Sequence, residues 1–212
     1  MKKIILLVVA LAFLAINNKA QGYHDDFRDR LMFGIKAGLN VSNVYDTKGE
    51  EFRADPKVGM AAGIFLSIPI GKFLGFQPEM LFSQKGFQAT GKILGSNYGL
   101  TRTTDFIEFP MLFQVKPAPF LTLVVGPQYS YLIKQKDEFG NGNSTVEQQQ
   151  EFKNDNIRKN IMCFLGGFDV NLNHIALGAR VGWDITNNNG NGTSSTPRYK
   201  NVWYQATFGL RF

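Results

Sequence analysis

The sequence predicts an all-β fold: an eight-stranded antiparallel up-and-down transmembrane β-barrel with short periplasmic turns and long extracellular loops. Apolar residues alternate with polar or small ones along most of the chain, which is typical of strands with one apolar face. The connections between these segments alternate between short and long. No apolar run reaches the ~20 residues of a spanning helix, so we expect any membrane crossing to use strands.

The N-terminus predicts export. Lys2 and Lys3 precede an apolar run over 4–16, and the small residue Ala20 follows a short polar stretch, as in a cleaved signal peptide. A buried N-terminal helix is the alternative interpretation. Because the single cysteine lies far from this cleavage site, a lipoprotein is not expected. We therefore expect a signal peptide at 1–20, a short periplasmic N-terminal segment at 21–30 and the barrel domain at 31–212.

Composition narrows the function classes. Removing residues 1–20 takes away three lysines, which lowers the formal net charge from +6 to about +3. The basic balance therefore does not indicate nucleic-acid binding. A lone cysteine, Cys163, excludes an intramolecular disulfide, and we expect it to pack as a small apolar residue. About 190 mature residues form one domain.

The first four predicted strands are clearly amphipathic, and each is close to the ~9–11 residues that a tilted strand needs to cross the hydrocarbon. The residues expected to face lipid are Phe33, Ile35, Ala37, Leu39 and Val41 in 33–42; Val58, Met60, Ala62, Ile64, Leu66 and Ile68 in 58–68; Phe76, Pro78, Met80 and Phe82 in 76–85; and Ile107, Phe109, Met111, Phe113 and Val115 in 106–115.

The second four strands follow the same period. The lipid-facing residues are Leu121, Leu123, Val125, Pro127, Tyr129 and Tyr131 in 121–131; Ile175, Leu177, Ala179, Val181 and Trp183 in 175–184; and Val202, Tyr204, Ala206, Phe208, Leu210 and Phe212 in 201–212. The sixth strand, 161–170, is the least regular. We place its Asp169 on the inner face, because an unpaired carboxylate in lipid is costly.

The lengths of the connections predict which rim of the barrel faces the periplasm and which faces outward. Short turns lie at 71–74, 116–119 and 171–174, and long polar loops lie at 45–56, 86–102, 134–160 and 186–200. In an up-and-down meander every short turn falls on the periplasmic rim and every long loop on the outer rim.

Three local patterns lie within the long loops. Ser144 to Glu147 form a capping box that predicts a short helix over 145–153. Residues 86–92 nearly match a phosphate-binding loop, but Ile93 replaces the required Ser or Thr, so we expect an ordinary loop. The Asn/Gly-rich runs lack the carboxylate spacing of calcium loops, and we expect neither metal nor cofactor.

A soluble lipocalin-like barrel has the same periodicity with the faces reversed. The many glycines on the non-apolar face suit a tight interior better than a water-facing surface. Aromatic residues near strand ends suit the interface girdles of a membrane barrel. They are Phe76, Phe113, Tyr129, Tyr131, Trp183, Tyr204 and Phe212. Both observations favour the membrane protein.

The inward charges are the best candidate site. They are Lys36, Glu79, Lys85, Glu108, Arg180 and Asp184, with Asp169 and Arg211 nearer the periplasmic rim. Side chains just fill an eight-stranded barrel, and charges there must be paired. We expect a structural luminal charge network that plugs the lumen rather than an open pore; a proton or substrate relay is the alternative. We expect Tyr204, Phe208, Leu210 and Phe212 to close the barrel and to serve as its assembly signal.

An enzyme at the outer rim is a competing class. Its base would commonly be a histidine, yet His24 precedes the first strand and His174 lies in a periplasmic turn. Neither reaches an outer-rim nucleophile such as Ser144 or Ser194. We do not expect an enzyme.

Three segments resemble the recurring strand motifs of PorT-like outer-membrane β-barrel proteins: FGIKAGLN at 33–40, QPEMLFSQKG at 77–86 and FIEFP at 106–110. The resemblance covers essentially the whole mature chain. It implies a location in the outer membrane and, for one group of members, service in the type IX secretion apparatus.

Together these observations predict a monomeric integral outer-membrane barrel that is structural or binds a ligand or partner through its extracellular loops. A component of a type IX-like protein-secretion assembly is one alternative, and an outer-rim lipid-modifying or proteolytic enzyme is the other. The expected partners are outer-membrane lipid, the barrel-assembly machinery acting on the C-terminal strand and, in the first alternative, secretion subunits. Nucleic acid is not expected.

Overall fold

The computed structural model describes residues 26–45, 53–93, 96–141, 144–150, 158–188 and 199–212. The signal peptide expected at 1–20 lies outside these ranges, as do residues 21–25 of the expected periplasmic segment. Within the described ranges, the structure contains no helix long and apolar enough to cross a membrane.

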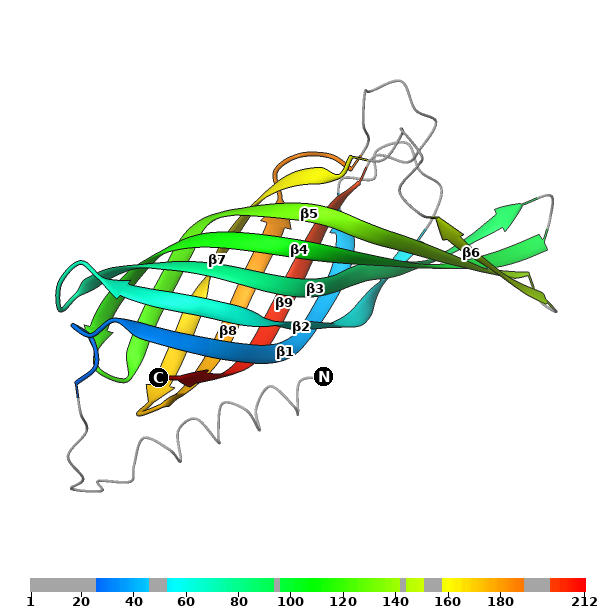
Figure 1. Cartoon of the computed structure of the whole chain (residues 1–212). Helices are drawn as coiled ribbons and strands as arrows, with labels where there is room; N and C mark the ends of the chain where they lie inside the picture. Colours follow the sequence, from blue (N-terminus) through cyan, green and yellow to red (C-terminus); the bar gives the residue numbers. More distant parts are fainter. Residues whose placement is uncertain (1–25, 46–52, 94–95, 142–143, 151–157, 189–198) are drawn as a thin grey trace.

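Eight strands form a closed antiparallel barrel, and a ninth, β6, pairs with β5 only (Figure 1). Consecutive strands pair from β1 to β5 and from β7 to β9, and β5 also pairs directly with β7. Pairing of β1 with β9 closes the barrel. The strands are β1 Met32–Tyr45, β2 Arg53–Pro69, β3 Leu74–Ile93, β4 Ser96–Ala118, β5 Leu121–Asn141, β6 Ser144–Gln150, β7 Asn160–Leu172, β8 Ile175–Asp184 and β9 Lys200–Arg211. The predicted fold class is confirmed.

The closing pair β1–β9 joins the two ends of the sheet. Its register places Ile35 opposite Leu210 and Val41 opposite Tyr204. The Phe33 amide donates to the Phe212 carbonyl over 3.1 Å, and the Phe212 amide donates to the Phe33 carbonyl over 2.7 Å. Closure satisfies the backbone groups that would otherwise form open edges, which lipid cannot solvate.

The two faces of the wall have the predicted orientation. Large apolar side chains of every barrel strand are exposed on the outside, including Leu39, Met60, Phe113 and Phe208 at 50–58%. The alternate residues, such as Lys36, Asn40 and Glu79, are buried in the interior. The outer surface is therefore an apolar belt of the kind that acyl chains solvate.

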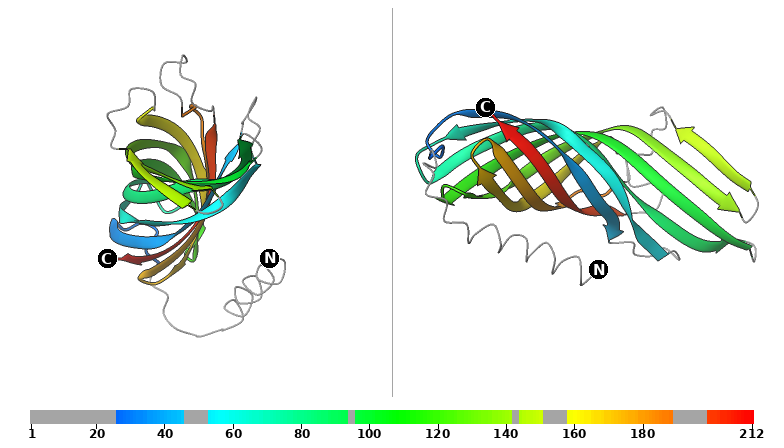
Figure 2. Two further views of the ribbon diagram at one scale, coloured as in Figure 1. Left: turned by 90° about the vertical axis from the view of Figure 1, so that its right-hand side faces the viewer. Right: turned by 90° about the horizontal axis from the view of Figure 1, so that it is seen from below.

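The barrel is strongly asymmetric in height. Strands β7, β8 and β9 have 13, 10 and 12 residues, whereas β3, β4 and β5 have 20, 23 and 21. At ~3.3 Å per residue, β4 spans about 75 Å and β8 about 33 Å. The additional residues of β3, β4 and β5 extend together beyond the rim opposite the short turns (Figures 1 and 2). We call this sheet the outer extension: 86–93 of β3, 96–105 of β4, 134–141 of β5, and β6.

The outer extension corrects three sequence predictions. Segment 86–102 and much of 134–160 were expected to be loops, yet β3 pairs with β4, and β5 with β6, through most of them. The helix expected at 145–153 is wrong over 145–150, which is strand, and 151–153 lie outside the described residues. Pairing with β5 outweighs the local capping signal. The near match to a phosphate-binding loop at 86–92 is also strand and has no helix after it.

At the opposite end, three short turns connect the strands where the sequence predicted them, at 70–73, 119–120 and 173–174. The second and third are shorter than predicted, because 116–118 and 171–172 belong to strands. Two residues, Asn173 and His174, connect β7 to β8, and Asn173 has a positive φ of 51°. Asparagine tolerates this left-handed conformation better than most residues, which suits it to so tight a turn.

Candidate functional site

The six predicted luminal charges all lie inside the barrel and are at most 6% exposed. They come from β1, β3, β4 and β8. The structure divides them between two groups at different heights along the lumen rather than joining them in one network. Lys36, Glu79 and Arg180 belong to the group nearer the periplasm, and Lys85, Glu108 and Asp184 to the other.

The periplasmic cluster consists of Lys36, Glu79, Asp169 and Arg180. Glu79 is its centre: one of its carboxylate oxygens lies 2.6 Å from Lys36 Nζ and 2.8 Å from an Arg180 nitrogen. The other Arg180 nitrogen reaches the two oxygens of Asp169 over 3.3–3.4 Å. Two cations thus face two carboxylates, which is the pairing that a desolvated interior requires.

Neutral side chains extend the periplasmic cluster. Gln77 donates to Glu79, Gln114 donates to Gln77, and Ser67 donates to the Gln114 oxygen over 2.9 Å.

A Cβ on Gly34 would overlap the ring of Phe65, which in turn lies 5.3 Å from Lys36 Nζ. The inward glycine therefore makes room for a large luminal side chain, as the sequence indicated.

The central cluster consists of Lys85, Glu108, Cys163, Asp184 and Trp203. Lys85 Nζ lies 2.6 Å from Glu108 Oε1 and 3.1 Å from the centroid of the Trp203 ring. This ammonium is 1% exposed and therefore interacts with both a carboxylate and an aromatic face in a desolvated setting.

Asp184 completes the central cluster from β8. Its Oδ2 accepts from the backbone amide and the side-chain amide of Asn201, over 2.9 and 2.6 Å. Its Oδ1 accepts from the Cys163 thiol over 3.2 Å, and the same sulfur lies 3.4 Å from Ser130 Oγ. The expectation that Cys163 packs only as a small apolar residue is thus incomplete, because it also connects Ser130 to Asp184.

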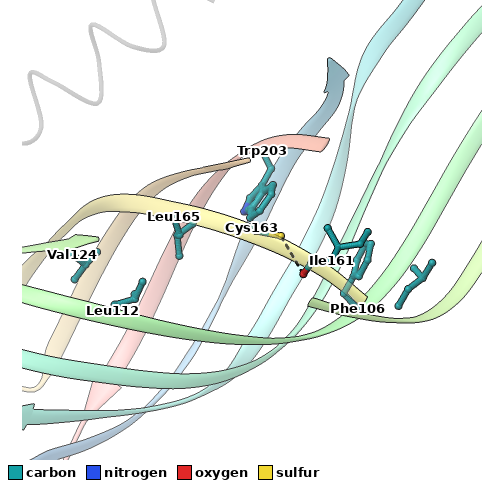
Figure 3. Close-up of a cluster of buried hydrophobic side chains, with 8 residues drawn as sticks. Phe106, Leu112, Val124, Ile161, Cys163, Leu165 and Trp203 are labelled. Carbon is teal, nitrogen blue, oxygen red and sulfur yellow. Dashed lines mark hydrogen bonds between the residues drawn. The ribbon is translucent and has the colours of Figure 1, made fainter. Parts of the chain in front are cut away.

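Part of the lumen is apolar, which corrects the expectation of a polar plug. A cluster of buried side chains from β4, β5, β7 and β9 lines one side of the interior (Figure 3). Its members are Phe106, Leu112, Val124, Leu132, Ile161, Cys163, Leu165 and Trp203. Trp203 is fully buried, and a Cβ on Gly182 would overlap its indole. The indole fills space that inward glycine leaves, and it joins the apolar cluster to the charged one.

A further ion pair, which the sequence analysis did not identify, lies where the barrel meets the outer extension. Arg102 binds Asp137 through two nitrogens, over 2.7 and 2.8 Å, and donates to the Tyr199 hydroxyl over 3.3 Å. Tyr199 stacks edge-on against Phe87 at 5.2 Å. Continuing the period of two from Phe106 back through Thr104 to Arg102 would have placed Arg102 on the inner face.

The N-terminal segment contacts the periplasmic mouth of the barrel. Arg28 pairs with Asp26 over 2.7 Å, and its carbonyl accepts from Lys116 Nζ over 3.1 Å. Hydrogen bonds from Arg28 hold the pKa of Asp26 well below its usual range. Phe27 packs against the His174 ring at 5.6 Å.

The chemistry of the interior is that of a closed, ion-paired core. Among the described residues, no group of three or more His, Cys, Asp or Glu is arranged to hold a metal ion. His174 lies in the β7–β8 turn, where its ring nitrogen contacts the Arg211 carbonyl over 2.9 Å. Ser144 begins β6 in the outer extension, while His24 and Ser194 lie outside the described residues.

The four aromatic and aliphatic residues predicted to close the barrel lie on the outer face of its last strand. Tyr204, Phe208 and Phe212 are 50–65% exposed, and Leu210 is half-buried. Leu210 and Phe208 stand opposite Ile35 and Ala37 of β1. They thus form the seam where the barrel closes.

Comparisons with known proteins agree with this architecture. Residues 19–190 match the family model described as "Outer membrane protein beta-barrel domain". No curated protein sequence matches the chain.

Several solved structures match most of this chain at low sequence identity. Ail, the attachment invasion locus protein of Yersinia pestis, has 12% identity and a TM-score of 0.48, over 85% of this chain and 98% of that one. Neisserial surface protein A has 12% identity and a TM-score of 0.46, over 85% and 97%. OprG of Pseudomonas aeruginosa has 15% identity and a TM-score of 0.38, over 85% and 95%.

The family match covers most of the chain, and the closed wall has an apolar outer belt. The chain therefore belongs to the outer membrane protein beta-barrel domain family and is a protein of the cell outer membrane.

Proposed function

We propose that this protein is a closed outer-membrane barrel without channel or enzymatic activity, whose working surface is the outer extension. In this view the wall and lumen form a rigid anchor, and a partner at the cell surface binds the protruding sheet. The single observation that carries the proposal is the continuous pairing of β3, β4, β5 and β6 beyond the barrel.

The lumen supports the absence of a channel. Ion pairs of the periplasmic cluster and the Lys85–Glu108 pair cross the interior at two heights, and Trp203 fills the space beside the second. An eight-stranded barrel has an interior that side chains just fill. Solute passage would require breaking buried ion pairs, which is costly.

The outer extension supports a binding role. Most connections in compact proteins are short, and an ordered projection of this length orders many residues at an entropic cost. Arg102, Asp137 and Tyr199 brace its base against the barrel rim. A braced sheet presents its backbone in a fixed geometry, which favours binding.

Channel activity is tested by reconstituting the full mature protein in liposomes. We expect ion conductance and sugar-driven swelling equal to those of empty liposomes. Stable single-channel conductance in the folded, heat-modifiable protein would contradict the closed-lumen part of the proposal.

Partner binding is tested with a photo-crosslinking amino acid in cells. Placed at Gln88 of the outer extension, it should yield discrete adducts with a surface molecule, because Gln88 is exposed. The matched position is Leu39 on the apolar belt, where only lipid adducts are expected. Identical adduct patterns at the two positions would oppose a dedicated binding surface.

A second candidate is a component of a type IX-like secretion assembly. The PorT-like motifs at 77–86 and 106–110 favour it, as do the exposed apolar side chains at the periplasmic turns: Ile70, Phe73 and Phe120 are 55–67% exposed. A crosslinker at Lys72, within the first of these turns, followed by mild purification should recover secretion subunits. Recovery of lipid adducts alone would remove this candidate.

Assembly would follow the usual route of such barrels. We propose that the protein is a monomer and that the barrel-assembly machinery engages β9 through Tyr204, Phe208, Leu210 and Phe212. Their exposed outer face and their place at the closing seam support this role.

A further inference from the structure

A cavity lies at the periplasmic end of the lumen, between the periplasmic cluster and the N-terminal segment. Its walls include Lys36, Asp169 and Arg180 from the interior, Lys116 and Arg211 near strand ends, and Arg28 from the N-terminal segment. It is thus a small chamber bordered by cationic groups of four different strands and of the segment that precedes β1.

Positive charge exceeds negative charge around this cavity. Five cationic side chains line it, whereas in the described part of the chain three carboxylates form ion pairs with them: Asp26, Glu79 and Asp169. Lys116 donates to the carbonyl of Arg28, and Arg211 donates to the carbonyl of Asn173. These acceptors are neutral. Asp29 also interacts electrostatically with Arg28 and Lys116, so four carboxylates face five cations, and one positive charge remains in a partly desolvated space.

Two guanidinium groups also have unused donors there. The Nε atoms of Arg180 and Arg211 are buried and have no hydrogen-bond acceptor among the described residues. Arg180 is only 4% exposed, so bulk water does not solvate it. A buried charged donor without an acceptor is costly. An acceptor with negative charge in the cavity would satisfy both the donors and the charge balance.

The size of the cavity limits what this acceptor can be. Its volume is about 30 Å³, which gives room for about two water-sized groups. A monatomic anion fits this volume, whereas phosphate or sulfate, each with five heavy atoms, exceeds it.

We propose that this cavity is a binding site for a single chloride-sized anion, held by Arg180, Arg211 and Lys116 and covered by Arg28. The anion neutralises the excess charge at the periplasmic mouth. It thereby couples the N-terminal segment to the barrel interior. This site is separate from the outer extension and does not depend on a surface partner.

The direct test is anomalous diffraction from crystals of the wild-type protein grown in bromide. We expect one anomalous peak inside the cavity, within hydrogen-bonding distance of Arg180 or Arg211. Water alone at this position, with bromide at saturating concentration, would overturn the proposal.

A solution test uses chloride nuclear magnetic resonance on the folded protein in micelles. We expect saturable line broadening, and the Arg211→Gln variant should bind at least about tenfold more weakly because a charge-assisted hydrogen bond is lost. Lys200→Gln is the matched control, since it removes the same charge from the other end of β9. Heat-modifiable migration verifies that both variants fold.

Equal broadening in Arg211→Gln, Lys200→Gln and the wild-type protein would contradict the proposal. If Arg211→Gln does not fold, Lys116→Gln replaces it with the same expected loss. Sulfate should compete poorly with chloride at equal ionic strength, and equal competition would contradict the size limit.

Discussion

The barrel and its outer extension share strands β3, β4 and β5 but lie in different environments. In the barrel, β3, β4 and β5 have one face in lipid and one in a packed interior. In the outer extension the same strands continue without β7, β8 and β9 beside them (Figure 1). The barrel carries its charges as buried pairs at 0–10% side-chain exposure. In the outer extension the Arg102–Asp137 pair at the base is also buried, at 11% and 7%, whereas Lys136 and Glu138 pair at 33% and 41%.

This difference indicates that the residues that stabilise the protein lie mainly in the barrel rather than in the outer extension. The bilayer fixes the height and the alternation of the wall, and the narrow lumen fixes its pairing. Neither constraint applies to the outer extension, so its sequence can vary without loss of the wall, as the proposed binding role requires. Changes in the barrel should therefore alter folding, and equivalent changes in the extension should not.

The largest contrast should come from removing a carboxylate. Glu79→Gln removes the carboxylate that pairs with Lys36 and leaves Arg180 with Asp169 alone, and we expect a loss of about 3–5 kcal/mol in unfolding free energy. Glu138→Gln in the outer extension removes a half-exposed pair and should cost less than about 1 kcal/mol. Urea unfolding in lipid bilayers measures both. Equal losses in the two variants would remove the distinction.

A charge on the outer surface gives the next contrast. Leu39→Arg places a guanidinium in the apolar belt, and we expect a loss of about 2–4 kcal/mol near the bilayer midplane. Gln88→Arg puts the same group on the water-exposed extension, where little change is expected. The same unfolding assay applies. A stable Leu39→Arg protein would mean that this face does not contact acyl chains.

The junction between the two regions should respond more weakly. Arg102→Lys keeps the charge but loses the two-pronged contact with Asp137, which should cost about 1–2 kcal/mol. Because this pair braces the extension, we expect faster hydrogen exchange in 134–138 and unchanged exchange in 121–131. Uniform acceleration along the whole of β5 would contradict a local role.

The smallest effect concerns pH at the periplasmic mouth. Since Arg28 lowers the pKa of Asp26 in the folded state, this contact contributes fully above the ordinary carboxyl pKa. The contribution is lost only as pH falls through the lowered folded pKa. Carbon-detected titration of the Asp26 carboxyl should show this shift, and Arg28→Gln should return the pKa toward its ordinary value.

The sequence predicted the barrel because lipid imposes a regular signal. Leu39, Met60 and Phe208 alternate with Lys36, Gly63 and Gln205, so period and polarity agree in each strand. The inner positions of Glu79, Lys85 and Arg180 follow from the same alternation. Which of these charges would meet was not predictable, because strand register and the height of each side chain in the lumen are long-range properties.

The outer extension escaped prediction for a related reason. Thr101, Arg102 and Thr103 lie in the part of β4 where no apolar face continues, so the alternation that is clear at 106–115 did not mark this part as strand. Polar composition was interpreted as loop, although the threonines have a high β propensity. The apolar luminal cluster was missed because Ile161 and Leu165 lie in the least regular segment, and because the meeting of Phe106, Leu112 and Trp203 from separate strands depends on register.

The orientation of the side chains is tested most directly by the two tryptophans of the chain. Trp183 lies on the outer face beside Phe164, and Trp203 is fully buried in the lumen. Each is retained alone by replacing the other with Phe, and fluorescence is recorded in bilayers of brominated lipid. We predict strong quenching of Trp183 and little quenching of Trp203. Strong quenching of Trp203, or none of Trp183, would mean that the faces of the wall are not oriented as described.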